Sequence, residues 1–288
     1  MPELPEVETI RRDLQKELRG RKIARVEVRK KKMVRGSAGG LQMFLKGKSF
    51  SGIRRRGKLL IFAVAGGQRY LLVHLKMTGQ LIFVDAKKEE VIAGGHSGPD
   101  MEKLPNKYSH IIWHFTDGSV LYFNDLRQFG FGRLVDESAL AAVLAAYGVE
   151  PLEKKFTAAK LTEILGKRQT TLKSVLLNQA LIVGLGNIYV DEACFYAGVR
   201  PTRRAGSLTA AEIKQLYRGI GHVLRQSLKH RGTTFNSFRD GTGKRGNFVS
   251  KLKVYRRTGE KCKRCKGGII TRVKVSGRGT HFCPACQV

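Results

Sequence analysis

Apolar residues near the start of the chain recur at spacings of three and four, the period of one face of an α-helix. They stand at Leu4, Val7, Ile10, Leu14 and Leu18. This pattern predicts an amphipathic helix over residues 4–18. Gly20 supplies a helix-terminating residue shortly after it.

The period changes after this helix. Short runs rich in β-branched and aromatic residues follow one another, separated by Gly and Asp turn signals. The runs occupy residues 22–30, 59–66, 68–85, 108–125 and 129–137. Because a succession of short strands is typical of packed sheets, residues from about 20 to 135 predict a β-sandwich or β-barrel.

Helical periodicity returns at residues 138–148 and dominates the next part of the chain. Patterns at 157–167, 170–180, 187–198 and 209–232 predict a mainly α-helical domain. From Gly232 the chain becomes polar and Gly-rich, and it ends in a cysteine-bearing hairpin. The predicted fold class is α+β with several domains, namely residues 1–135, a linker 136–150, a helical domain 151–248 and a hairpin module 249–288.

The charge of the chain limits the kinds of partner that it can be expected to bind. Its 288 residues include 54 Lys and Arg against 23 Asp and Glu, a formal net charge of +31, while 42% of residues are hydrophobic. This combination indicates a folded protein with a polyanionic partner: nucleic acid, an anionic membrane surface or an acidic protein. No apolar run approaches the roughly 18 residues that span a bilayer. The acidic N-terminus does not resemble a signal peptide, so we expect a soluble cytoplasmic protein.

Four of the five cysteines form a compact set. Cys262 and Cys265 are two residues apart, Cys283 and Cys286 repeat this spacing, and seventeen residues separate the pairs. Two such turns at the ends of a β-hairpin complete the tetrahedral thiolate shell that Zn²⁺ accepts. This predicts one structural zinc with no open position for water, so catalysis must lie elsewhere. Cys194, in an apolar helical run, is predicted to be a core residue.

Two stretches of the second half are candidates for anion contacts. Arg278 stands between two glycines, and residues 232–288 hold 14 Lys and Arg against 2 acidic residues, which favours nucleic-acid contact over a merely solvated arginine. The turn "GLGNIYVDE", residues 184–192, opens a helix whose first N–H groups, with the Asn187 amide, could bind a phosphate. A glycine-rich turn is more often only a turn, and the spacing matches no dinucleotide or P-loop fingerprint.

The chain begins "MPELPEVET". One interpretation is a helix start, in which Glu3, Glu6 and Glu8 complement the positive end of the helix dipole. The other is that removal of Met1 leaves Pro2 as an N-terminal secondary amine, which is a potential nucleophile. This stretch alone leaves both interpretations open.

Five stretches, taken together and in order, resemble the formamidopyrimidine-DNA glycosylase family. They are "MPELPEVET", "HLKMTG", "NDLRQFG", "GLGNIYVDEACF" and "GRGTHFCPACQ", and the resemblance runs from residue 2 to residue 287. It implies a monomeric, bacterial-type, nucleoid-associated enzyme that removes oxidised purines, 8-oxoguanine and formamidopyrimidines, from double-stranded DNA and then cuts the abasic site. It also implies an N-terminal β-sandwich and a second lobe with a helix-two-turns-helix element and a zinc-finger hairpin, the DNA lying between them.

The resemblance implies catalytic roles in the first lobe. Pro2 would attack C1′ of the damaged nucleoside and form a Schiff base that drives β,δ-elimination. A typical α-amino pKa of about 8 makes this amine easier to deprotonate than a lysine with a pKa of about 10.4. Glu3 would shuttle protons, Glu6 would position the amine, and Lys58 would bind phosphates beside the lesion.

Excision also requires the damaged nucleotide to leave the base stack, and the vacated space must be filled. By resemblance Met77 fills this space, Phe129 wedges beside it, and Arg127 faces the orphaned base. Without the resemblance, Met77 and Phe129 would indicate core residues. Asn187 and Arg278 would contact phosphates.

The sequence departs from the family pattern in several places. His110 keeps its family position and is expected to contact DNA, whereas Tyr108 replaces a phosphate-contacting histidine of many relatives and receives no role. Residues 86–106 form a longer segment than usual. Residues 233–248 correspond to the loop over the flipped base but differ from its common sequence. The seventeen-residue gap between the cysteine pairs exceeds the commoner sixteen, a change that a hairpin can absorb.

Two alternative functions stay open at this point. The first is the sister branch of enzymes, which prefers oxidised pyrimidines. The second is a DNA-binding protein that no longer catalyses. Such a protein would be expected to have lost Pro2, Glu3 or Lys58, and all three are present.

Overall fold

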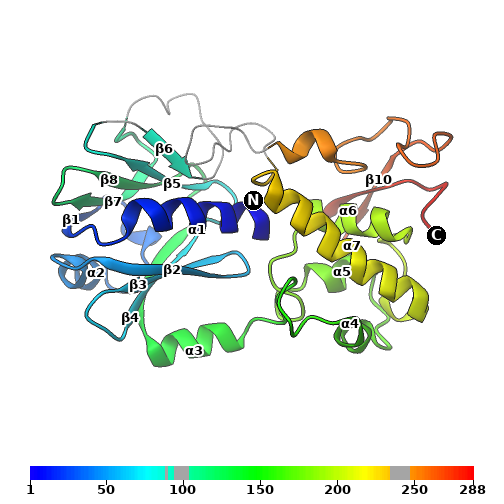
Figure 1. Ribbon diagram of the computed structural model, residues 1–288, viewed down its shortest axis with the longest axis horizontal. Helices are drawn as coiled ribbons and strands as arrows, with labels where there is room; N and C mark the ends of the chain where they lie inside the picture. Colours follow the sequence, from blue (N-terminus) through cyan, green and yellow to red (C-terminus); the bar gives the residue numbers. More distant parts are fainter. Residues whose placement is uncertain (88–89, 94–103, 234–246) are drawn as a thin grey trace. The chain divides into compact units, whose positions relative to one another are not determined.

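The computed structural model describes residues 1–87, 90–93, 104–233 and 247–288. Within these residues the chain forms two compact units: the first comprises Met1–Ala145 with His230–Val249, and the second Ala146–Lys229 with Ser250–Val288. Strands predominate in the first unit and helices in the second (Figure 1). Residues 230–249 thus group with the first unit. The division into domains at residues 135, 150 and 248 stays a prediction.

The described part of the first unit contains two antiparallel sheets. The four-stranded sheet has the order β2 (Phe50–Arg56), β3 (Leu59–Val64), β4 (Arg69–His74) and β9 (Phe131–Asp136). The five-stranded sheet has the order β1 (Ile23–Val28), β7 (Ser109–Phe115), β8 (Val120–Asp125), β5 (Gly79–Val84) and β6 (Glu90–Ala93). Side chains of both sheets share one hydrophobic core, so the predicted β-sandwich is confirmed.

Helices complete this core. α1 (Leu4–Leu18) buries the apolar face that its sequence period predicted and contacts strands of both sheets. α2 (Ala38–Leu45) packs on β1 and was not predicted, because its sequence is short and holds two adjacent glycines. Ser37 begins α2 by accepting the Gly40 N–H at 3.0 Å. α3 (Glu137–Ala145) matches the helical pattern expected after the strands.

The second unit consists of helices and a hairpin. Its helices are α4 (Ala158–Leu165), α5 (Leu172–Leu177), α6 (Asn187–Ala197) and α7 (Ala210–Lys229), and its hairpin strands are β10 (Thr271–Val275) and β11 (Arg278–Phe282). Short 3₁₀ helices occupy Lys31–Met33, Ala205–Ser207 and Phe248–Lys251. Because α6 packs on both α7 and β11, the hairpin is attached to the helical part. None of the helices in the described ranges is long and apolar enough to cross a membrane.

A partly buried carboxylate ties α1 to the neighbouring sheet. Glu8 accepts hydrogen bonds from Arg11 at 2.9 Å and Arg12 at 2.8 Å on its own helix, and from Arg55 of β2 at 3.0 Å. Burial opposes ionisation of this carboxyl, but the hydrogen bonds from the three arginines outweigh it and hold its pKa at about 2. The Glu8 charge therefore stabilises the folded chain.

Acid should remove this contribution of Glu8. Because its pKa in the folded protein lies below the unfolded value, the stabilisation is complete above about pH 5 and is lost as the pH falls toward about 2. With allowance for solvent exposure, we expect about 2 kcal/mol at neutral pH. Denaturant titrations of the wild type and Glu8→Gln should differ by that amount near pH 7 and by less at about pH 3. An equal difference at both pH values would contradict this assignment.

Candidate functional site

The first turn of α1 is fixed by a buried carboxylate. Pro2 and Glu3 are buried directly ahead of the helix, and Glu3 is its N-cap residue. Glu6 accepts the Glu3 N–H through Oε2 at 2.8 Å and the Thr233 N–H through Oε1 at 2.7 Å. The helix-start interpretation is thus confirmed, and the same contacts fix the peptide that follows Pro2.

The backbone beside Glu6 requires a glycine. Gly232 has a φ of 90°, in the left-handed region, and a Cβ there would lie 3.0 Å from Glu6 Oε1. Glu6 can therefore reach the Thr233 N–H only past a residue without a side chain. Most of the predicted loop over the flipped base, residues 233–248, lies outside the described residues.

Lys58 lies in the tight turn between β2 and β3 and is 6% exposed. The β3–β4 register pairs the next residue, Leu59, with His74. Burial, followed by the charges of Lys76, Lys58 and Arg35, lowers the pKa of His74 to about 3. The Lys76 N–H donates to His74 Nδ1 at 3.0 Å, so the neutral imidazole holds its proton on Nε2. The sequence pattern assigned no role to His74. Its position at the start of "HLKMTG" was the available signal.

Met77, Arg127 and Phe129 come together on the surface of the first unit. Met77 is 40% and Phe129 51% exposed, so the core interpretation of these two side chains is wrong. Arg127 Nη1 lies 3.0 Å from Met77 Sδ, and its guanidinium lies 4.7 Å from the centroid of the Phe129 ring. A thioether, a cation and an aromatic ring thus form one exposed group, which we call the exposed trio.

His110 is buried beside this group. Its Nε2 lies 2.8 Å from the backbone oxygen of Asp125 and donates to it. Burial lowers the pKa of His110, against the opposing effect of this hydrogen bond. The neutral ring supports the connection that bears Arg127, and a contact between His110 and DNA stays a prediction.

In the second unit, a buried ion pair joins α5 to α6, and both of its members bind the hairpin. Lys173 and Asp191 are fully buried, with Lys173 Nζ 2.6 Å from Asp191 Oδ1. Lys173 Nζ also donates to the Gly279 carbonyl at 3.0 Å. The second Asp191 oxygen accepts the His281 N–H at 2.8 Å. These bonds hold β11 against the helix, so the hairpin turn has a fixed position relative to α6.

The two predicted phosphate contacts lie next to this network. The Asn187 Nδ2 atom donates to the Gly279 carbonyl at 3.0 Å, at the first residue of α6. Arg278 precedes Gly279 and is exposed. The structure therefore brings Asn187 and Arg278 to the same part of the second unit, 91 residues apart in the sequence, where a helix N-terminus adds its positive end.

The four predicted cysteine ligands converge. The sulfur atoms of Cys262, Cys265, Cys283 and Cys286 all lie within 4.8 Å of one another. A Cβ on Gly268 would lie 2.5 Å from the Cys283 sulfur, so a glycine is required beside this cluster. Four thiolates at this spacing fit one structural zinc with a closed shell. Cys194 is fully buried, which raises the pKa of its thiol and confirms it as a core residue.

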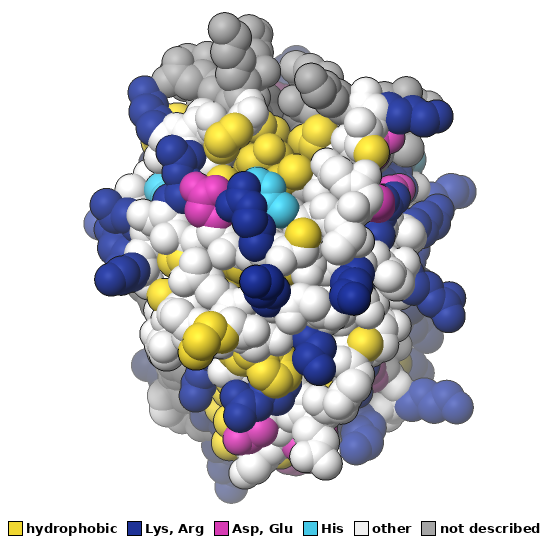
Figure 2. Space-filling view, turned by 90° about the vertical axis from the view of Figure 1, so that its left-hand side faces the viewer, with side chains coloured by type: hydrophobic (Ala, Val, Ile, Leu, Met, Phe, Trp, Pro, Cys, Tyr) yellow, Lys and Arg dark blue, Asp and Glu magenta, His cyan; other side chains and the backbone are white. Residues whose placement is uncertain are grey.

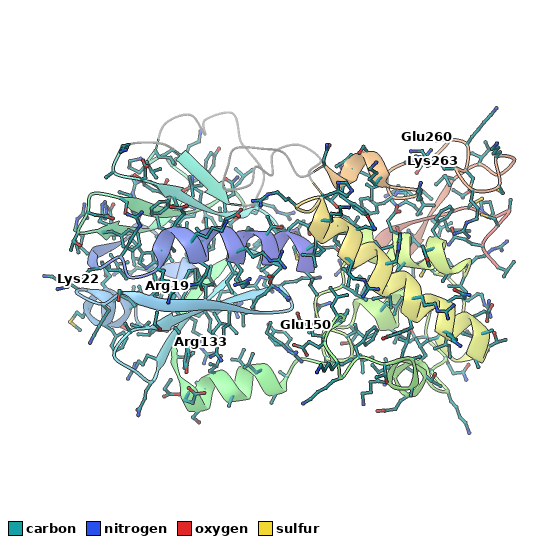
Figure 3. All side chains as sticks on the ribbon, viewed as in Figure 1. Arg19, Lys22, Arg133, Glu150, Glu260 and Lys263 are labelled. Carbon is teal, nitrogen blue, oxygen red and sulfur yellow. The ribbon has the colours of Figure 1, made fainter. Side chains whose placement is uncertain are left out.

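Cations dominate the surfaces of both units. Figure 2 shows Lys and Arg side chains spread over one face of the first unit, with few Asp and Glu among them. Arg19 and Lys22, which flank the end of α1, are exposed, as are Lys263 and Glu260 near the cysteine cluster (Figure 3). This distribution suits contact with a polyanion over an extended area.

Comparison with known proteins decides the family. Family profiles described as "Formamidopyrimidine-DNA glycosylase N-terminal domain", "Formamidopyrimidine-DNA glycosylase H2TH domain" and "Zinc finger found in FPG and IleRS" match residues 1–132, 147–239 and 259–288. The chain belongs to the formamidopyrimidine-DNA glycosylase family. Its class is therefore that of a DNA glycosylase with abasic-site lyase activity, as the sequence resemblance implied.

Individual relatives cover the whole chain. Formamidopyrimidine-DNA glycosylase of Symbiobacterium thermophilum is 42% identical over all of this chain and 89% of its own length, and that of Desulfitobacterium hafniense (strain DSM 10664 / DCB-2) is 40% identical over all of both chains. The solved complex of Lactococcus lactis Fpg with abasic-site DNA matches with a TM-score of 0.88 at 35% identity over 99% of each chain. A complex of the same protein with N7-benzyl-Fapy-dG DNA gives 0.87 at 36% identity over the same shares.

Metal analysis should find one zinc in each chain. Cys262→Ser should abolish zinc binding, because zinc binding and folding of the hairpin are one event. Hydrogen exchange in residues 259–288 should accelerate in this variant while the first unit keeps its protection. Cys194→Ala is the matched control and should retain zinc. A zinc-free wild type with an unchanged hairpin would refute the assignment.

Proposed function

We propose that this enzyme excises oxidised purines, 8-oxoguanine and formamidopyrimidines, from duplex DNA and cleaves the resulting abasic site through a Schiff base on Pro2. The observation that carries the proposal is the buried start of α1, where one Glu6 oxygen binds the peptide N–H between Pro2 and Glu3 and the other binds the Thr233 N–H. A proline used merely to begin a helix would not require that Glu6 itself be held by Thr233, 227 positions further along the chain.

The chemistry follows from the residues at the helix start. Once Met1 is removed, the Pro2 nitrogen attacks C1′ and the bond from C1′ to the base breaks, with a proton going to the departing base. Glu3 protonates the sugar ring oxygen as the ring opens, which leaves an iminium between Pro2 and C1′. Because this iminium withdraws electrons, the C2′ proton is lost and the 3′ phosphate leaves, followed by the 5′ phosphate.

The exposed trio is suited to hold the duplex open around a flipped nucleotide. Met77 is flexible and apolar enough to occupy the vacated space, and Phe129 offers a flat ring to the adjacent base. The contact of Arg127 with both side chains directs its guanidinium toward the same space. There it can donate to the base left behind, so we assign Arg127 to reading the opposite base.

Phosphate contacts account for the remaining predicted residues. Lys58 in the first unit, and Asn187 with Arg278 in the second, supply donors for the strand that contains the lesion. The net charge of +31 supports double-stranded DNA as the partner. We further propose that the chain acts on this DNA as a monomer in the cytoplasm. The Lactococcus lactis complexes with Fapy-dG DNA favour purine lesions over the pyrimidine-preferring alternative.

Borohydride trapping tests the role of Pro2. Reaction with abasic or 8-oxoguanine duplex in the presence of borohydride should reduce the iminium and attach DNA to the first residue of the mature chain, located by mass spectrometry. Pro2→Gly should lower glycosylase and lyase rates together while binding of an uncleavable abasic analogue stays near that of the wild type. Pro5→Ala, in the same helix turn, is the matched control and should trap normally. An adduct at Lys58 or another lysine would overturn the mechanism.

Replacement of Arg127 tests opposite-base reading. Arg127→Ala should narrow the preference for 8-oxoguanine opposite cytosine over the same lesion opposite adenine by about 1 to 3 kcal/mol, the value of a good side-chain contact to a base. Arg133 of β9, labelled in Figure 3, lies on the same unit outside the trio, and Arg133→Ala should leave the ratio unchanged. Single-turnover excision rates on the two duplexes give the answer, and an unaltered ratio in Arg127→Ala would show the assignment to be wrong.

A further inference from the structure

The connections that bear the exposed trio lie outside the regular sheet pairing. β4 ends at His74 and β5 begins at Gly79, with Met77 between them. β8 ends at Asp125 and β9 begins at Phe131, with Arg127 and Phe129 between them. Because exposed side chains gain little direction from packing, their placement depends on what holds the backbone beneath them.

One carboxylate holds both connections. Asp125 is fully buried, and its Oδ1 accepts the Thr78 hydroxyl and the Arg127 N–H, the latter at 3.2 Å. Its Oδ2 accepts the Gly130 N–H at 2.7 Å. These three donors belong to the residue after Met77, to Arg127 itself and to the residue after Phe129. Every member of the trio is therefore within one residue of a bond to Asp125.

Further contacts close this arrangement. Thr78 Oγ1 accepts the Arg127 N–H at 3.0 Å while its hydroxyl donates to Asp125, which links the two connections directly. His110 Nε2 donates to the backbone carbonyl of Asp125. At Gly130 a Cβ would lie 3.0 Å from Asp125 Oδ2, so the short bond to its N–H depends on glycine. The Thr78 hydroxyl, the Arg127 N–H and the Gly130 N–H all donate to Asp125. A donor group in place of either carboxylate oxygen would therefore face another donor.

We propose that Asp125 is a positioning residue for base flipping: its carboxylate sets the spacing of Met77, Arg127 and Phe129 so that the three side chains act as one unit. This inference rests on the proposed function and adds a residue that does not touch DNA. An asparagine has nearly the same shape but replaces one acceptor oxygen with an N–H₂ group, which would face an N–H or O–H donor. Asp125→Asn should therefore loosen the trio while leaving Pro2 intact.

The test separates opening of the duplex from chemistry. A single-stranded abasic oligonucleotide needs Pro2 but offers no stacked partner to displace, whereas an 8-oxoguanine:cytosine duplex needs both. We expect Asp125→Asn to lower the single-turnover rate on the duplex at least about tenfold relative to the single strand, the scale for a misplaced group in an active site. Thr78→Val, which removes one of the three bonds, should act in the same direction with a smaller ratio. A 2-aminopurine beside the lesion should show a matching loss of the fluorescence rise that reports unstacking.

The control is Asp136→Asn. Asp136 also accepts a backbone N–H, that of Ala139 at 2.8 Å, but at the start of α3 and away from the trio. Asp136→Asn should leave the ratio of the single-turnover rates on the duplex and on the single strand unchanged. An unchanged ratio in folded Asp125→Asn, or in Thr78→Val if Asp125→Asn does not fold, would refute the positioning role. Failure of the wild type to cleave both the abasic duplex and the 8-oxoguanine duplex would instead refute the proposed function.

Discussion

The proposed chemistry depends on one constraint, the hydrogen bond between Glu6 and the peptide that follows Pro2. A free chain terminus is normally mobile, since nothing opposes the conformational entropy of its first residues. Here the first helical turn is closed by a carboxylate that is 4% exposed, and the other oxygen of that carboxylate binds Thr233. In the proposed mechanism, this bond gives the Pro2 amine a fixed position from which it can attack the sugar of a bound nucleotide.

The same use of acids recurs through the structure. Asp125 holds the exposed trio, Asp191 binds the hairpin to α6, and Glu192 accepts the N–H groups of residues 253–255. In a chain with 54 cations and 23 acids, these carboxylates are buried and accept backbone N–H groups, while Lys and Arg cover the surface. Burial of these acids leaves cations in excess on the surface, which suits a polyanionic partner.

Local patterns predicted the local structure well. The period of three and four gave α1 at its observed bounds, and the cysteine spacing gave the metal cluster, because both depend on residues close in sequence. Helix α2 and strand β2 were missed, since one is short and glycine-rich and the other ends in three arginines. The apolar character of Met77 and Phe129 alone indicated core positions, yet both side chains are exposed.

Long-range contacts could not be predicted from periodicity. The bonds from Glu6 to Thr233 and from Lys173 to Gly279 join residues more than 100 positions apart, and only folding brings them together. The role of Pro2 required the family resemblance, because a helix start and a nucleophile look alike in "MPELPE".

The most direct test of the role of Pro2 compares the mature chain with the same chain in which Met1 stays attached. Without a free Pro2 amine, incision of 8-oxoguanine duplex should fall to background while binding to an uncleavable analogue persists; equal incision by both chains would contradict the account.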